Sequence, residues 1–337
     1  MAPIIVSAEA RAVHEAALVV DLHNDMLLAS YFLGWDWHRR HAPNPLPGAP
    51  LLGHSDLPRL REGNVGAVAF GVVTSPLRWS GGTAAIHRDL DTLAAEVARS
   101  GGTMEIAGSA QAIRAARAAG RVAAFAGLEG AHGLHGRTDE LGALRVKGLR
   151  YVGLVHFTAN AAGRPMVGLG ADNAAELPPF GRELLDALAH HRMICDAAHL
   201  GKAAVIEACR RSPGRVMVSH TGCTAVHASP RGIDDEVLRA VADADGVVGI
   251  IFVPPFIGTG GARAVARHLD HVKKTVGARH CALGTDWEGF ALYPSDLDSA
   301  EKLPNLTQAL LDIGWTSEDI HAAYGENVLR VIERACG

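Results

Sequence analysis

Eight short apolar runs recur along this chain, and segments with helical periodicity separate most of them. Runs of this kind are typical of strands buried on both faces of a parallel sheet. The predicted strands lie at residues 17–25, 65–73, 122–128, 149–155, 193–196, 215–219, 246–252 and 280–284. Because eight strand–helix units follow one another without a linker, we predict an α/β fold of the closed (β/α)8 TIM-barrel type.

The intervening segments complete the predicted barrel. Helices are expected at residues 55–62, 86–100, 111–119, 141–146, 181–191, 202–211, 234–244, 262–276, 306–313 and 317–335. No shift in composition marks a boundary, so residues 1–337 are predicted to form a single catalytic domain. An open doubly wound sheet is the alternative. It predicts a glycine-rich phosphate turn after the first strand, whereas residues 21–25 are DLHND.

Bulk composition excludes several classes of protein. The chain has 337 residues, 48% of them hydrophobic, and a formal charge of −4 without charged runs, which excludes a nucleic-acid footprint. No window of 18 consecutive apolar residues occurs, and the N-terminus lacks the basic start and apolar core of a signal peptide. We therefore expect no association with a membrane. Five scattered cysteines without a CxxC motif predict reduced thiols and a cytoplasmic location.

Residues that commonly bind metal ions stand at the carboxyl ends of the predicted strands. His23 and Asp25 close the first run at a spacing of two, so on an extended chain they point to the same side. Later strands are followed by Glu129, His156, His199, His220 and Asp286. In this type of barrel that face carries the active site. Polar residues placed for solubility alone would occur equally at both strand ends, so a functional site is predicted.

The chemistry of these residues predicts two metal ions. Nitrogen and oxygen ligands without a thiolate suit Zn²⁺ or a similar divalent ion in an open catalytic site. Glu129 lies in the sequence between the pair His23 and Asp25 and the pair His199 and His220, and we assign it as the bridging ligand. Two ions roughly 3.5–4 Å apart can share one hydroxide and polarise a carbonyl oxygen, which is the chemistry of amide hydrolysis.

Most of the 18 histidines are expected to have structural roles. His268 and His271 lie on a predicted helix that leads into the last strand, near the other end of the barrel, so no metal role is predicted for them. His132 and His135 follow Glu129 closely and are left open.

We predict that residues 31–56 form a long loop near the active-site face. The stretch contains Trp35, Trp37 and several prolines, which make a regular helix unfavourable. Long loops in compact domains are usually functional or disordered, and the aromatic side chains favour an ordered loop. A surface excursion without a role is the alternative.

Several motifs together resemble the membrane (renal) dipeptidases, peptidase family M19, and the chain looks like a soluble bacterial-type member. The main motifs are His23-Asn24-Asp25, Leu128-Glu129-Gly130, Asp196-Ala197-Ala198-His199, Ser219-His220-Thr221 and Gly284-Thr285-Asp286-Trp287-Glu288-Gly289. Their order and spacing match over about residues 20–329. The resemblance implies a barrel of the metal-dependent hydrolase type with two Zn²⁺, or another divalent metal, per chain. It also implies a dipeptide-like small-molecule substrate, and a homodimer is a possible assembly.

The resemblance implies a role for each ligand. His23 and Asp25 bind one zinc ion, Glu129 bridges the pair, and the other zinc ion is bound by His199 and His220. This agrees with the assignment made from the residues themselves.

Three further roles come from the resemblance alone. His156 polarises the scissile carbonyl and stabilises the tetrahedral oxyanion. Arg231 pairs with the substrate carboxylate, for which its bidentate fork is suited. Asp286 exchanges protons with the bridging water and then with the leaving amine.

The sequence departs from the family pattern near the site, though at none of the ligands. Ala197-Ala198 replaces Leu-Ser before His199, which removes a hydroxyl that could support that ligand. Trp287-Glu288 makes a bulkier mouth, Val253 stands where an aromatic residue is usual, and Gly232 replaces Asn after Arg231. These changes affect the expected choice of substrate.

Three functional hypotheses follow. The leading one is a zinc-dependent dipeptidase that hydrolyses short substrates with a free C-terminal carboxylate. The second is a related amidohydrolase that acts on N-acyl amino acids, lactams or lactones. The third is a barrel that keeps its metal for structure or binding only. Retention of all ligands together with His156 and Asp286 argues against the third.

Overall fold

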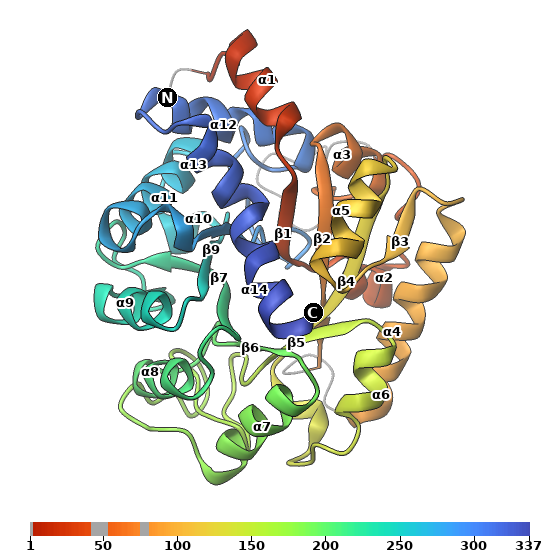
Figure 1. Cartoon of the computed structure of the whole chain (residues 1–337), viewed down its shortest axis with the longest axis vertical. Coiled ribbons are helices and arrows are strands. Elements are labelled where there is room, and N and C mark those ends of the chain that lie inside the picture. Colours follow the sequence, from red (N-terminus) through yellow and green to blue (C-terminus); the bar gives the residue numbers. More distant parts are fainter. Residues whose placement is uncertain (1–2, 42–52, 75–80) are drawn as a thin grey trace.

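The computed structural model describes residues 3–41, 53–74 and 81–337. Eight parallel strands form a closed ring: β1 (Val19–Asn24), β2 (Val65–Val73), β4 (Val122–Glu129), β5 (Leu149–Gly153), β6 (Ile194–Asp196), β7 (Val216–Cys223), β9 (Val247–Ile250) and β10 (Cys281–Leu283). Each strand pairs with the next one in this order, and β1 pairs with β10 to complete the ring (Figure 1). The predicted (β/α)8 barrel is therefore confirmed.

Two very short strands lie outside the ring. β3 (Met104–Ile106) pairs with the start of β4, and β8 (Gly232–Ile233) pairs with the end of β7. Neither strand was predicted, because neither lies in an apolar run of the kind that identified the ring strands.

Some ring strands differ from their predicted lengths. β5 ends at Gly153, although the apolar run continues through Leu154 and Val155. The carbonyl of Leu154 accepts hydrogen bonds from the Ala131 amide and the Asn160 side chain, so loops rather than a strand use this backbone. β7 extends beyond its predicted end and includes His220.

Helices surround the ring. The α-helices are α1 (Ala8–Ala16), α2 (Met26–Leu33), α3 (Leu57–Glu62), α4 (Gly82–Arg99), α5 (Ala110–Ala118), α6 (Leu141–Val146), α7 (Pro179–His190), α8 (Lys202–Arg211), α9 (Asp235–Asp243), α10 (Pro254–Ile257), α11 (Ala262–Val276), α12 (Leu303–Asp312), α13 (Ser317–His321) and α14 (Asn327–Cys336). Short 3₁₀ segments are η1 (Ala131–Leu134), η2 (Ala278–His280) and η3 (Ala300–Lys302). α1 and α2 were not predicted, and α2 occupies the first residues of the predicted loop 31–56.

The predicted C-terminal helix is interrupted. A π-helical turn, η4 (Ala322–Glu326), separates α13 from α14. It places Tyr324 in the core, where the phenol oxygen lies 2.9 Å from the Thr307 hydroxyl of α12. π-helical turns of this kind commonly interrupt longer helices.

The barrel is filled by its own strand residues and closed at one end by α14. Val328, Ile332 and other apolar residues of α14 cluster with Ile194 and Val247, the first residues of β6 and β9. Figure 1 shows α14 crossing over the ring. This helix therefore covers the amino ends of the strands and leaves the carboxyl ends for the site. Among the described residues, no helix is long and apolar enough to cross a membrane.

Candidate metal centre

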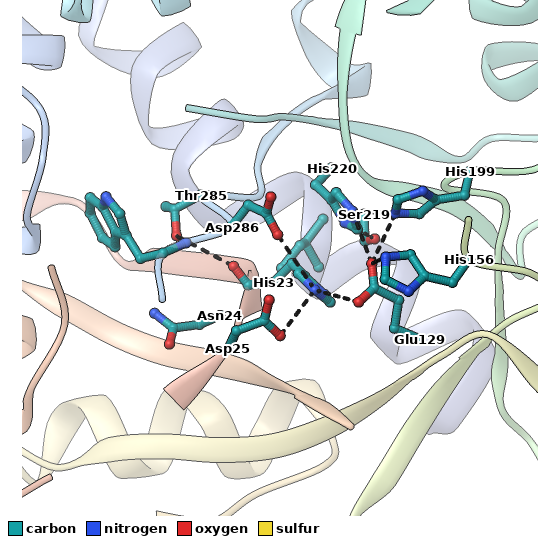
Figure 2. Close-up of polar contacts among 12 residues, drawn as sticks. His23, Asn24, Asp25, Glu129, His156, His199, Ser219, His220, Thr285 and Asp286 are labelled. Atoms are coloured by element: carbon teal, nitrogen blue, oxygen red, sulfur yellow. Dashed lines mark hydrogen bonds and ion pairs between the residues drawn. The ribbon is translucent and has the colours of Figure 1, made fainter. Parts of the chain in front are cut away.

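Six acidic and imidazole side chains that could hold a metal ion lie together at the carboxyl end of the barrel, and Figure 2 shows them. They come from β1, β4, β7 and the segments that follow β1, β6 and β10, and they are His23, Asp25, Glu129, His199, His220 and Asp286. The structure thus brings together residues that lie up to 263 positions apart (286 − 23). Two of them have a left-handed backbone, with φ of 66° at His199 and 61° at Asp286. Such strain in non-glycine residues concentrates at functional sites.

Glu129 lies between two groups of ligands. Its Oε2 is 3.5 Å from Nε2 of His23, and its Oε1 is 2.9 Å from Nε2 of His199 and 3.3 Å from Nε2 of His220. Because its two oxygens face opposite groups, this carboxylate has the geometry of a bridging ligand.

The ligand atoms form three overlapping triads. In each triad they lie within 4.8 Å of one another: His23, Asp25 and Glu129; Glu129, His199 and His220; His23, His220 and Asp286. Asp25 precedes α2 at its N-cap position but makes no capping hydrogen bond. Its carboxylate is therefore available to the centre.

Unpartnered atoms in this cluster fit a metal ion. His23 Nε2 and Asp25 Oδ1 are buried and have no hydrogen-bond partner among the residues that the structure describes. Burial raises the pKa of Asp25 well above its ordinary value, and the nearby carboxylates of Glu129 and Asp286 add to the rise. A divalent cation would satisfy the unpartnered atoms and relieve the repulsion among these carboxylates. The donor set, nitrogen and oxygen only, suits zinc.

Buried polar groups behind the ligands fix two of the imidazoles. The Tyr151 hydroxyl donates to the Leu22 carbonyl (2.8 Å), so at 3.1 Å it accepts from Nδ1 of His23. The Ser219 hydroxyl donates to Asp196 (2.6 Å) and therefore accepts from Nδ1 of His220 (2.8 Å). Both rings then present an unprotonated Nε2 to the centre, which is the form that binds metal.

Sequence reasoning missed these supporting residues. Asp21 is buried and accepts from the backbone amide (2.9 Å) and hydroxyl (2.7 Å) of Thr285, which fixes the segment before Asp286. Asp196 similarly holds Ser219. Asp21 and Asp196 could have been recognised from the sequence, because each is a carboxylate inside an apolar run and a buried charge requires partners. Tyr151 gave no such signal, since its partner lies across the barrel.

Two glycines make room for the cluster. A Cβ on Gly71 would lie 2.4 Å from Asp25 Oδ1, and one on Gly127 would lie 1.7 Å from the Tyr151 ring. Both are close-approach positions on β2 and β4, where any side chain would displace a site residue.

A cavity of about 410 Å³ opens onto the centre. Its polar lining includes His156, Arg231 and Asp286, and most of the remaining wall is apolar, including Leu28, Val253, Phe256, Phe290 and Leu292. His156 Nε2 lies 3.5 Å from Glu129 Oε1, and Asp286 Oδ1 lies 3.8 Å from His23 Nε2. Burial raises the pKa of Asp286 to about 7, and Glu129 contributes to the rise.

Arg231 is a buried cation that forms no ion pair with any described carboxylate. One Nη donates to the His220 carbonyl (3.1 Å), the other lies 3.6 Å from Met166 Sδ, and Nε is unpartnered. No carboxylate of the described residues lies within ion-pair distance of it. Burial lowers the pKa of Arg231 to about 10, so the guanidinium stays charged at neutral pH. A buried charge that faces a cavity and has no ion-pair partner in direct contact indicates a site for an anion.

Other histidines lie outside the cluster. His268 accepts from the Cys223 amide (2.9 Å) and donates to the Ile257 carbonyl (3.1 Å), and burial lowers its pKa to about 4. His271 pairs with Asp235 (2.7 Å). His132 Nε2 lies 2.9 Å from the carbonyl oxygen of Thr158. Each has a structural partner and none belongs to the triads.

The C-terminal end of the predicted loop 31–56 contacts the segment that follows β10, next to the candidate metal centre. Glu288, two residues after Asp286, accepts from the amides of His54 (2.8 Å) and Ser55 (2.6 Å). Residues 42–52 of this predicted loop lie outside the described residues.

Comparison with known proteins gives one family and several related structures. The membrane dipeptidases (peptidase family M19) match residues 7–336. Dipeptidase tcpJ of Claviceps purpurea (strain 20.1) is 29% identical over 306 residues, which are 85% of this chain and 70% of that protein. The structure of the dipeptidase AC, a metallo peptidase of family M19, has a TM-score of 0.84 at 24% identity, covering 95% of this chain and 98% of that one. A metallo peptidase from Rhodobacter sphaeroides, liganded with a phosphinate mimic of the dipeptide L-Ala-D-Ala, has a TM-score of 0.80 at 23% identity, covering 95% and 99%.

Proposed function

The chain belongs to the membrane dipeptidase family, peptidase family M19, and from this premise we propose that it is a zinc-dependent dipeptidase. Its substrates would be dipeptide-like molecules with a free C-terminal carboxylate. One observation carries this proposal: a buried, unpaired Arg231 lines the same cavity as the cluster around Glu129. Such a substrate requires a cation that binds its carboxylate and a metal site beside that cation.

We assign two metal positions that share Glu129. The first metal site consists of His23, Asp25 and Glu129, and the second consists of Glu129, His199 and His220. When bound, two zinc ions would supply a shared hydroxide as nucleophile and the Lewis acidity that polarises the amide carbonyl. The protein holds the ligands in place through Tyr151 and Ser219.

The remaining residues of the cavity orient the substrate and move its protons. Arg231 would hold the substrate carboxylate in a bidentate pair. His156 lines the cavity beside Glu129 and would donate a hydrogen bond to the carbonyl oxygen as negative charge develops on it. Asp286, whose pKa is raised to about 7, would accept a proton from the nucleophilic water and deliver it to the leaving amine.

Replacing Glu129 by Gln tests the proposal. The substitution keeps the shape of the side chain but removes the charge that both metal sites share, so turnover of a dipeptide panel should fall by at least about 10³-fold and metal content should drop from two ions. The matched control is Glu236→Gln on the exposed surface. This variant should retain both turnover and metal content. A metal-replete wild-type protein that cleaves no dipeptide of a broad panel would refute the substrate assignment.

A second candidate is hydrolysis of N-acyl amino acids, lactams or lactones. The apolar wall formed by Leu28, Phe290 and Leu292 favours this candidate. An acyl chain can pack against such a wall, whereas a dipeptide also carries an α-amino group that needs a polar partner. Assaying acyl amino acids in parallel with dipeptides, at equal metal loading, separates the two candidates through the ratio of kcat/KM values.

We also propose a cytoplasmic location. All five cysteines are buried with free thiols. This supports a reducing compartment, in which disulfides are rare.

A further inference from the structure

The two proposed metal sites differ in charge. The first site contains the carboxylate of Asp25 in addition to shared Glu129, and Asp286 lies beside its imidazole at 3.8 Å. The second site adds only two imidazoles to Glu129. The first site is therefore the more anionic of the two, and a divalent cation is attracted to it more strongly.

A buried cation lies next to the second site. The Arg231 guanidinium donates to the carbonyl of His220, a ligand of that site, and no described carboxylate is close enough to pair with it. Because this positive charge is held against a residue of the second site, it opposes the binding of a divalent cation there.

The ligands of the second site are also held less completely. Nδ1 of His23 and Nδ1 of His220 each contact a hydroxyl that fixes the ring. Nδ1 of His199 is buried and has no partner in the described structure. Its neighbour is Ala198, whereas the neighbour of His220 is Ser219, whose hydroxyl supports that ring. Imidazole ligands that lack such a partner bind metal more weakly.

From these three differences we propose that the metal ions bind in order, the first site before the second, and that a ligand carboxylate at Arg231 tightens binding of the second ion. The inference rests on the proposed two-metal function and adds a coupling between the sites. A carboxylate on Arg231 neutralises the charge that opposes the second ion. By reciprocity, the second ion tightens binding of the carboxylate to the same extent. A substrate with a free carboxylate thus helps to complete the site that hydrolyses it.

The test is a titration of the metal-free full-length protein with Co²⁺, followed by its visible spectrum in the presence of a competing chelator. We expect two steps, with the second weaker by about tenfold or more. The titration is repeated with 3-phenylpropionate, which has one carboxylate, no amine, and an apolar body suited to the cavity wall. It should tighten the second step by about tenfold and leave the first unchanged. Neutral 3-phenylpropanamide is the matched control and should shift neither step.

Two variants separate charge from packing. Arg231→Met removes the charge but keeps an extended side chain, so the second step should tighten without ligand and 3-phenylpropionate should have no further effect. Arg231→Lys keeps the charge, so its second step should stay weak. Circular dichroism verifies the fold of each variant, and if Arg231→Met does not fold, the wild-type titrations with the acid and the amide decide the question.

Two equal steps in the wild-type protein, or a second step unaffected by 3-phenylpropionate, would overturn the inference. So would a folded Arg231→Met variant whose second step is as weak as that of the wild type. A wild-type protein that binds no more than one ion even with the carboxylate present would instead contradict the proposed two-metal function. The two failures are thus distinguishable.

Discussion

The hydroxyl of Tyr151 determines which nitrogen of His23 carries the proton. Tyr151 reaches from β5 to β1, gives its only proton to the Leu22 carbonyl, and is left as an acceptor for Nδ1 of His23. Without that hydroxyl the ring could carry its proton on either nitrogen, and one of the two tautomers cannot bind metal through Nε2.

Tyr151→Phe should therefore weaken binding of the first metal ion by about 10- to 100-fold. The measurement is a competition titration with a chromophoric chelator. Tyr324→Phe is the matched control, because Tyr324 is also fully buried and its hydroxyl contacts Thr307 away from the site. Equal metal affinity in the two variants would show that Tyr151 does not position His23.

At the scale of single residues, the structure brings together the residues that the sequence predicted as ligands, whereas the residues that support them were not predicted. Placing His, Asp and Glu after strands needs only strand ends and residue chemistry. Recognising Tyr151 needs the contact between β5 and β1, which no local pattern contains. Asp21 and Asp196 lie between these cases, since a carboxylate in an apolar run signals a partner without identifying it.

Among the elements, α8 is fastened to α7 by one carboxylate. Glu207 accepts from Arg182 (2.6 Å), from Arg211 (2.8 Å) and from the backbone amide of Leu177 (2.9 Å). The hydrogen bond from Arg182 is the main reason that its pKa is lowered to about 2. The side chain is largely buried, so these contacts are stronger than those of an ordinary surface pair.

Glu207→Gln should lower the free energy of unfolding by about 2 kcal/mol at pH 7. The folded-state pKa lies below the ordinary value of 4.5, so the carboxylate stabilises the fold above pH 4.5 and loses this effect as pH falls toward 2. Urea unfolding at pH 3 should therefore show a difference about half as large. Glu176→Gln, at an exposed partner of Arg182, should change stability by less than about 0.5 kcal/mol. A difference for Glu207→Gln that is independent of pH would contradict this account.

The sequence predicted most elements because each buries one face against the ring. The misses have local causes. α2 begins directly after Asp25, where the polar residues that follow β1 suggested a turn. The π-helical turn before α14 contains Tyr324, which contacts Thr307 of α12, and periodicity cannot show such a contact between distant segments.

For the whole molecule, the candidate metal centre connects distant parts of the chain. Its ligands come from the beginning, middle and end of the ring, so an unfolded chain cannot present them together. An ion that binds only the native state stabilises it by mass action.

Removing the metal with a chelator followed by dialysis should lower the melting temperature by several degrees, and adding Zn²⁺ back should restore it. Differential scanning calorimetry measures the change. The Glu129→Gln variant should respond much less to the same treatment, because it lacks the ligand that both sites share. An unchanged wild-type melting temperature would contradict a bound native-state ion.

Closure of the ring also has a consequence for synthesis. A ribosome makes His23 and Asp25 early, but β1 lacks one neighbour until β10 has emerged, since Asp21 of β1 pairs with Leu283 of β10. A chain without β10 contains ligand residues, but the closed ring that positions them has not yet formed. We therefore expect a chain truncated before β10 to take up less zinc than the finished polypeptide, although it contains His23, Asp25, Glu129, His199 and His220.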